Sequence, residues 1–169
     1  IRKDLGDDYT AFMIPVVDQE SAVTMPRLFA DVEKLSDFFA SIGLKKGDVY
    51  TVFVPTCGHA VVALYALNKL GIIANYVHPM TPPNALEGIM THTKSKGILT
   101  LDLLAGPFAS VLAKYPTIVG SVSDFCDGIA LKYALYNEEQ NANVPELDTI
   151  TRYKDILSMN LPASEPVRN

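Results

Sequence analysis

The chain has 169 residues, which is enough for one domain with a substantial hydrophobic core. Its composition, 49% apolar and 20% charged, is that of an ordinary soluble globular protein. The net charge of −5, with no block of Lys or Arg, argues against a nucleic-acid-binding or membrane-binding surface, so neither is expected among its partners.

The N-terminal part of the chain predicts a β-hairpin. The run Thr10–Val17 is rich in strand-forming residues, and its Pro15 suits an edge strand. A polar turn over residues 18–20 separates this run from a second one, Ser21–Met25, which completes the hairpin.

The first long helix is expected to begin after Thr24, whose side chain can cap it, and Pro26 fits its first turn. An apolar stripe recurs at helical spacing and should face the core; its members are Leu28, Val32, Leu35, Phe39 and Ile42. Gly43 is suited to end this helix in the left-handed conformation.

From residue 49 onward, strands and helices alternate. Strands are expected at Val49–Val54, buried on both faces, and at Ile72–Val77, Gly97–Leu101 and Thr117–Val122. Helices are expected at His59–Leu70, from a Thr81 cap to about Lys96, and at Leu103–Lys114 with a break near Gly106-Pro107. This order is typical of βαβ units. The predicted fold class is α/β: an N-terminal β-hairpin, then a mostly parallel sheet with helices on both faces.

The structural signal weakens beyond residue 123. Residues 127–140 could form a helix or an irregular excursion, and residues 141–145 have the composition of a loop. A short helix is expected at Tyr153–Met159, and residues 161–169 are expected to form an extended tail. We expect residues 1–169 to form a single α/β subdomain.

Cysteine usage and apolar runs favour a cytoplasmic protein. Cys57 and Cys126 lie far apart and form no CxxC pair, which suits a reducing compartment better than a disulfide scaffold. The longest apolar run, Ala60–Leu67, is too short to cross a bilayer, and no signal-peptide pattern opens the chain. Because the first residue is Ile1 rather than Met, we expect a piece of a longer protein.

Ligands bind beyond the carboxyl ends of strands in open α/β sheets, so any functional residues are expected in the turns that follow the predicted strands. These turns are residues 55–58, 78–83, 102–107 and 123–128. None of them contains a GxGxxG or a GxxxxGK[ST] pattern, so no phosphate-binding loop is predicted there.

Cys57 and His59 are the first candidate pair. Cys57 precedes a predicted helix, whose positive end would favour a thiolate, and His59 follows two residues later. A nucleophilic pair also needs a group that orients the imidazole, and no acidic residue lies nearby in the sequence. A structural turn thiol beside a helix-starting histidine is therefore the favoured interpretation.

The other polar candidates also have structural explanations. His78 follows a strand expected to be buried and could line a cleft, although satisfying a loop carbonyl is the commoner role. Asn75 needs a partner, for which a backbone hydrogen bond is favoured. Asp124 and Asp127 flank Cys126, but without a third ligand they fit turn and cap chemistry better than a metal site.

Two tyrosines complete the set of candidates. Tyr133 and Tyr136 could form a lid over an acyl pocket, but a satellite hydrophobic cluster is the favoured interpretation. The residues alone therefore predict an α/β domain with no complete catalytic, cofactor-binding or metal-binding set.

Short motifs occur in a characteristic order between residues 23 and 83. They are TMPRL at 24–28, IGLKKGD at 42–48, VPT at 54–56, KLGIIA at 69–74 and HP at 78–79. Together with the later GILTL and TRYKDIL, they resemble the opening third of the AMP-forming adenylating enzymes, which include acyl- and aryl-CoA synthetases, peptide-synthetase adenylation domains and luciferases. The resemblance covers roughly residues 10–160. Met25, Arg27, Thr56 and His78 depart from the family pattern at positions that carry no chemistry in the family.

The resemblance implies a parent enzyme that uses ATP and magnesium to adenylate a carboxylic acid and then passes the acyl group to coenzyme A. The phosphate loop of that family would follow residue 169. We therefore carry over no catalytic, cofactor-binding or metal-binding residue, and we expect the fragment to bind no cofactor and to be inactive alone. Its expected partners are the remainder of the parent chain and, through exposed apolar surface, a second copy of itself.

Two other classes of protein stay open. One is a free-standing α/β ligand-binding or receiver-like module, and the other is an interaction-only relative of the ligases. A receiver would need acidic residues clustered at strand ends, and Asp102 is the one acidic residue directly after the first three predicted parallel strands.

Overall fold

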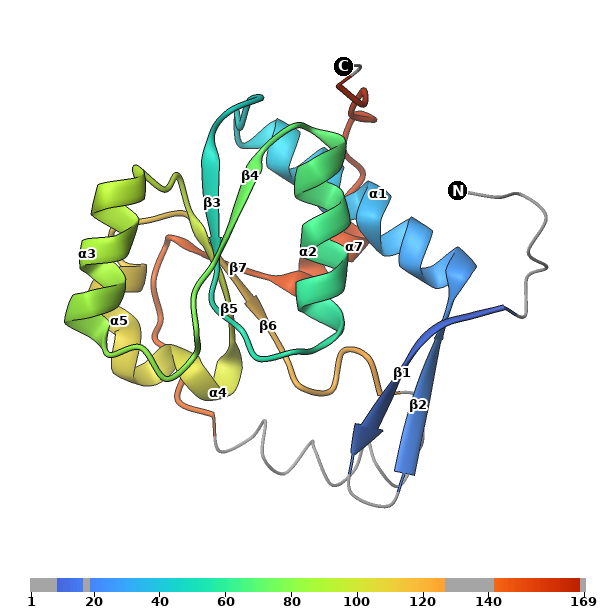
Figure 1. The fold of residues 1–169 in the computed structure, drawn as a ribbon, viewed down its shortest axis with the longest axis horizontal. Coiled ribbons are helices and arrows are strands. Elements are labelled where there is room, and N and C mark those ends of the chain that lie inside the picture. Colours follow the sequence, from blue (N-terminus) through green and yellow to red (C-terminus); the bar gives the residue numbers. More distant parts are fainter. Residues whose placement is uncertain (1–8, 17–18, 127–141, 168–169) are drawn as a thin grey trace.

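The computed structural model describes residues 9–16, 19–126 and 142–167, and a five-stranded parallel sheet lies at its centre (Figure 1). The strand order is β4-β3-β5-β6-β7. The strands are β3 (Val49–Val52), β4 (Ile73–Tyr76), β5 (Ile98–Leu101), β6 (Thr117–Gly120) and β7 (Ile150–Arg152). Every neighbouring pair is parallel, which confirms the predicted α/β class.

The predicted hairpin is present as a separate two-stranded sheet, β1 (Thr10–Val16) with β2 (Gln19–Thr24). Gln19 and Glu20 pair with Val16 and Pro15, so the predicted polar turn over residues 18–20 was too long: two of its residues belong to the ladder. The Ser21 hydroxyl donates a hydrogen bond to the Phe125 carbonyl at 2.7 Å, which fastens the hairpin to the loop after β6.

Helix α1 (Met25–Ser41) begins and ends as the sequence predicts. The Thr24 hydroxyl accepts a hydrogen bond from the Arg27 N–H at 3.5 Å, and Gly43 follows the helix at φ +83°. Four of the five expected stripe residues are buried. Ile42 is instead 38% exposed, because it is the C-cap residue and lies outside the helix.

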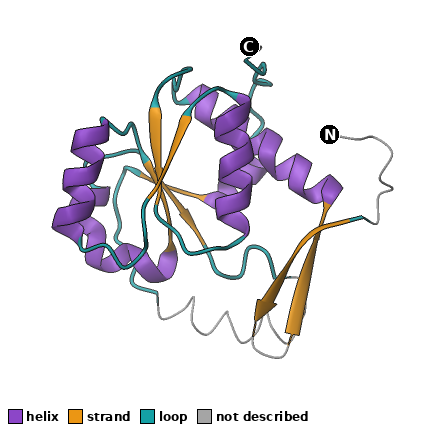
Figure 2. Ribbon diagram, in the orientation of Figure 1, coloured by secondary structure: helices purple, strands orange, loops and turns teal. Residues whose placement is uncertain are grey.

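Helices cover both faces of the sheet (Figure 2). One face carries α1, α2 (Gly58–Lys69) and α7 (Tyr153–Ser158); the other carries α3 (Pro83–Thr93), α4 (Asp102–Ala105) and α5 (Ala109–Leu112). Side chains of β5 alternate between the two faces. Leu99 and Leu101 lie in the hydrophobic core under α1, α2 and α7, and Ile98 lies in the core under α3, α4 and α5. The expected break near Gly106-Pro107 is a 3₁₀ turn between α4 and α5.

Three expectations about the elements were wrong. The N-cap of α3 is Pro82, not Thr81, and the helix ends at Thr93 because Lys94 adopts a left-handed φ of 55°. Strand β4 is an exposed edge rather than a buried strand, with Ile73 56% exposed. Strand β7 was not predicted, since three residues are too few to show a strand pattern.

The C-terminal segment contacts helices α1 and α2. Residues 159–167 form neither helix nor strand. The Ser164 N–H donates to Asp37 Oδ1 at 2.7 Å on α1, and the Val167 N–H donates to the Lys69 carbonyl at 2.9 Å at the end of α2. Within the described ranges, no helix has the length and apolarity to cross a membrane.

Candidate functional site

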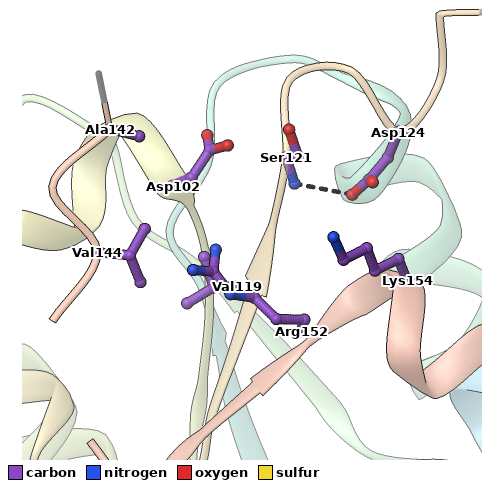
Figure 3. Close-up of a pocket in the computed structure, with 8 residues that line it drawn as sticks. All are labelled: Asp102, Val119, Ser121, Asp124, Ala142, Val144, Arg152 and Lys154. Atoms are coloured by element: carbon purple, nitrogen blue, oxygen red, sulfur yellow. Dashed lines mark hydrogen bonds between the residues drawn. The ribbon is translucent and has the colours of Figure 1, made fainter. Parts of the chain in front are cut away.

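A polar cavity of about 240 Å³ opens where β5, β6 and β7 end (Figure 3). Its walls are Asp102, Val119, Ser121, Asp124, Ala142, Val144, Arg152 and Lys154. This is the edge at which open α/β sheets bind ligands. The cavity is therefore the natural candidate for a functional site in the described part of the chain.

The ends of β5 and β6 place the acidic and hydroxyl groups of this cavity. Asp102 follows β5 directly, is 1% exposed, and accepts a hydrogen bond from the Leu103 N–H at 2.8 Å. After β6 the chain turns tightly, because Asp124 Oδ2 accepts from the Ser121 N–H at 2.7 Å. Hydrogen bonds from nearby backbone N–H groups therefore hold both carboxylates at the cavity wall.

The cations of the cavity come from the C-terminal elements. Arg152 is the last residue of β7, and Lys154 lies in the first turn of α7. Figure 3 shows Lys154 pointing toward Asp124, and the Arg152 guanidinium on the side of Asp102 and Val119. Among the described residues, neither cation forms an ion pair within 4.0 Å. The cavity can therefore offer positive charge to a small anionic group.

Asp124, which lines this cavity, also forms a buried ion pair with His59. His59, in the first turn of α2, is 2% exposed, and its Nε2 lies 2.8 Å from Asp124 Oδ2. The rings of Phe125 and Tyr153 each contact the imidazole edge-to-face, with ring centroids 4.8 Å away. Burial lowers the pKa of His59, but the hydrogen bonds to Asp124 and Cys57 outweigh it and raise the pKa to about 9. His59 is therefore charged at neutral pH.

Two glycines make room for this arrangement. A Cβ at Gly120 would collide with the His59 ring, and a Cβ at Gly58 would lie 2.6 Å from the Phe125 ring. The end of β6 and the start of α2 can approach each other only because these positions lack side chains.

The structure brings the candidate pair Cys57 and His59 together with Asp124, which the sequence placed in a separate candidate group. Cys57 is the N-cap of α2, and its Sγ lies 3.8 Å from His59 Nδ1. The acidic group that orients the imidazole is Asp124, which lies 65 residues further along the chain. No local pattern could have revealed it.

His78 and Asn75 take structural roles that differ in detail from those expected. His78 is exposed, and its Nδ1 accepts a hydrogen bond from the Met80 N–H at 3.2 Å rather than satisfying a carbonyl. The Asn75 amide donates to the Thr51 hydroxyl at 3.2 Å, a side chain rather than the backbone. Neither residue lines the polar cavity.

The remaining candidates give no site within the described residues. Cys126 is buried, and its Sγ lies 3.5 Å from the Val122 carbonyl, to which it donates. Asp127, Tyr133 and Tyr136 lie outside the described residues. In residues 9–16, 19–126 and 142–167, no group of three or more His, Cys, Asp or Glu side chains is arranged to hold a metal ion.

Comparison with known proteins gives a consistent assignment. The sequence model of the family described as "AMP-binding enzyme" matches residues 6–165. Acetyl-coenzyme A synthetase of Yersinia pseudotuberculosis serotype O:1b (strain IP 31758) is 31% identical over 85 residues, which is 50% of this chain and 13% of that protein. The acetyl-coenzyme A synthetase of Serratia proteamaculans (strain 568) is 30% identical over 97 residues, or 57% of this chain and 14% of the relative. The chain matches well under two thirds of the length of these relatives.

Proposed function

Because this chain belongs to the AMP-binding enzyme family, we propose that it is the N-terminal part of an ATP-dependent, AMP-forming acid–CoA ligase. Such an enzyme joins a carboxylic acid to AMP, releases pyrophosphate, and transfers the acyl group to coenzyme A. The observation that carries the proposal is the family match over residues 6–165, which spans the described elements from the hairpin to α7. The acetyl-coenzyme A synthetase relatives support coenzyme A as the acyl acceptor.

The polar cavity does not fit a whole nucleotide. Its volume of about 240 Å³ lies below the roughly 300–1,000 Å³ of typical small-molecule sites. Asp102 and Asp124 also lie on its walls, and carboxylates oppose a polyphosphate. We therefore assign no residue of this chain to ATP or magnesium, and we propose that the fragment alone is inactive.

The described residues instead support a scaffold role. The His59–Asp124 pair holds the start of α2 against the turn after β6, and Ser21 joins the hairpin to the same turn through the Phe125 carbonyl. This fixes the carboxyl edge of the sheet, where ligands of α/β proteins bind. The proposed contribution of the chain to the ligase is a rigid wall that the rest of the enzyme faces.

A free-standing receiver-like module is the second candidate, and one observation favours it. Asp102 and Asp124 line the same cavity as Lys154, so the acidic residues at strand ends are closer together than the sequence implied. Asp124, however, is already hydrogen-bonded to the Ser121 N–H and to His59. A receiver would incorporate phosphate from a small acyl phosphate in the presence of magnesium, and the ligase proposal predicts no such incorporation.

The ligase proposal is tested with the full-length product of the gene that contains this sequence. We expect exchange of labelled pyrophosphate into ATP that depends on an added carboxylic acid, measured over a panel of acids. Absence of acid-dependent exchange across the panel would contradict the proposal. Calorimetry on the 169-residue chain should show no binding of magnesium–ATP. Micromolar binding would show that residues of this chain do contribute to an ATP site.

A further inference from the structure

The polar cavity at the ends of β5, β6 and β7 carries two cations that the proposed scaffold role does not use. Arg152 and Lys154 both line it, and among the described residues neither has a carboxylate oxygen within 4.0 Å. Cations held on the walls of a cavity without a counter-ion attract an anion from solution. The cavity is therefore a candidate ligand site in its own right.

The sheet and the helix after it determine where the two cations lie. In the ladder between β6 and β7, Arg152 is the partner of Val119, so both side chains leave the sheet on the same face. Lys154 follows two residues later, in the first turn of α7. Figure 3 shows Arg152 on one side of the cavity and Lys154 on the other. An anion between them would therefore meet positive charge from two directions.

The charges around the cavity leave an excess of one positive charge. Its walls carry two cations, Arg152 and Lys154, and two carboxylates, Asp102 and Asp124. Asp124 is compensated from outside the cavity, because its Oδ2 lies 2.8 Å from Nε2 of the buried His59. The charge of Asp102 then offsets one of the two cations. A ligand with a single negative charge makes the cavity neutral, whereas a dianion would leave an excess of negative charge beside Asp102.

The size and the apolar walls of the cavity narrow the class of ligand further. Its volume of about 240 Å³ equals that of roughly eight water molecules, so the ligand has only a few heavy atoms. Val119 and Val144 offer an apolar surface to a short hydrocarbon group. A small carboxylate combines such a group with one negative charge, and its planar head can accept two parallel hydrogen bonds from a guanidinium.

We propose that the polar cavity binds a small monoanionic carboxylate, of the size of acetate or propionate, between Arg152 and Lys154. The Arg152 guanidinium binds the carboxylate, Lys154 supplies the second positive charge, and the hydrocarbon end contacts Val119 and Val144. This site is separate from the proposed ligase reaction, which is assigned to no residue of this chain. The 169-residue chain should therefore bind the carboxylate by itself, whether or not the parent protein is a ligase.

Titration of the ¹⁵N-labelled 169-residue chain with sodium acetate tests the site by NMR, with sodium chloride holding the ionic strength constant. We expect the Val119 and Ser121 amide signals to shift and saturate, with a dissociation constant of about 1 mM for so small a ligand. Acetamide has the same shape without the charge and should cause no saturable shift, and sulfate should bind about tenfold more weakly than acetate. Shifts that do not saturate, or acetamide or sulfate binding as tight as that of acetate, would overturn the proposal.

The variants Arg152→Gln and Lys154→Gln test the two cations, with folding checked by circular dichroism. Each should weaken acetate binding by about tenfold or more, because a charge-assisted hydrogen bond is lost. The matched control is Lys96→Gln: Lys96 is exposed and precedes β5 at the opposite edge of the sheet, so the affinity should stay within about twofold.

An unchanged affinity in either cavity variant would overturn the two-cation site. Equal weakening in all three variants would show a general effect of net charge and would also overturn it. Should Arg152→Gln not fold, Lys154→Gln still decides, because Lys154 is an exposed residue of α7.

Discussion

At the scale of single residues, the contact between His59 and Asp124 has a measurable effect on stability. The pKa of His59 is raised from 6.5 to about 9, so the imidazolium is more stable in the folded state than in the unfolded state. This contribution is complete below pH 6.5 and is lost as the pH rises through about 9. Since His59 is 2% exposed, solvent screening reduces it little.

We therefore expect the free energy of unfolding to fall by roughly 3 kcal/mol between pH 6.5 and 9.5. Asp124→Asn should reduce this decline, because the charged partner is gone. The matched control is Asp155→Asn, an exposed carboxylate on α7, which should leave the decline unchanged. Urea unfolding followed by circular dichroism measures all three proteins, and an identical pH dependence in wild type and Asp124→Asn would contradict the account.

Gly120 gives a second prediction at the residue scale. A Cβ at this position meets the rigid, buried ring of His59, so Gly120→Ala should destabilise the fold by about 1–3 kcal/mol. Gly88 on α3 has nothing within 4 Å of its virtual Cβ, so Gly88→Ala should stabilise by about 0.5–1 kcal/mol. Urea denaturation compares the two, and a tolerated Gly120→Ala would show that the ring can move aside.

At the scale of elements, the sequence predicted what local patterns encode. The helical stripe of α1 and its Thr24 cap were visible because both lie within one short window. The apolar run of β3 likewise indicated a strand between two neighbours, and β3 does lie between β4 and β5. The fold class followed from the order of these elements.

Features that depend on distant partners were not predictable. Ile150–Arg152 forms β7 only because β6 offers a free edge, with Thr117 opposite Ile150. The contact of His59 with Asp124 spans 65 residues, and no period or motif in the sequence encodes it. The burial of β4 was also misjudged, because an apolar run does not reveal which strand ends a sheet.

The exposed edge of β4 leads to a prediction about association. In the described sheet, β4 pairs on one side with β3, and Ile73 is 56% exposed. Unpaired strand edges with apolar side chains promote pairing between chains. We expect the isolated chain to self-associate in size-exclusion chromatography with light scattering.

Ile73→Lys should shift this equilibrium toward the monomer, because charge on an edge strand opposes pairing. Leu103→Lys on α4, where the native side chain is 44% exposed, is the matched control and should leave association unchanged. A wild-type chain that elutes as a monomer at every concentration would rule out association through this edge.

At the scale of the whole molecule, the polar cavity and the apolar surface occupy different places. The polar cavity lies at the carboxyl ends of β5–β7, whereas an apolar cavity of about 460 Å³ lies between the hairpin, α1 and α2, with Phe12, Leu28 and Tyr65 among its walls. Small-molecule sites are commonly completed at boundaries between structural units. This arrangement suits one wall of a larger enzyme, as the AMP-binding family match implies.

The central claim is that the parent enzyme activates a carboxylic acid through an acyl-adenylate. It is tested most directly by supplying the full-length protein with ATP, coenzyme A and a carboxylic acid labelled with ¹⁸O in its carboxyl group. Attack of the carboxylate on the α-phosphate, followed by acyl transfer, leaves one labelled oxygen on AMP. The account predicts labelled AMP by mass spectrometry; ADP with labelled inorganic phosphate, or nucleotide turnover independent of the acid, would contradict it.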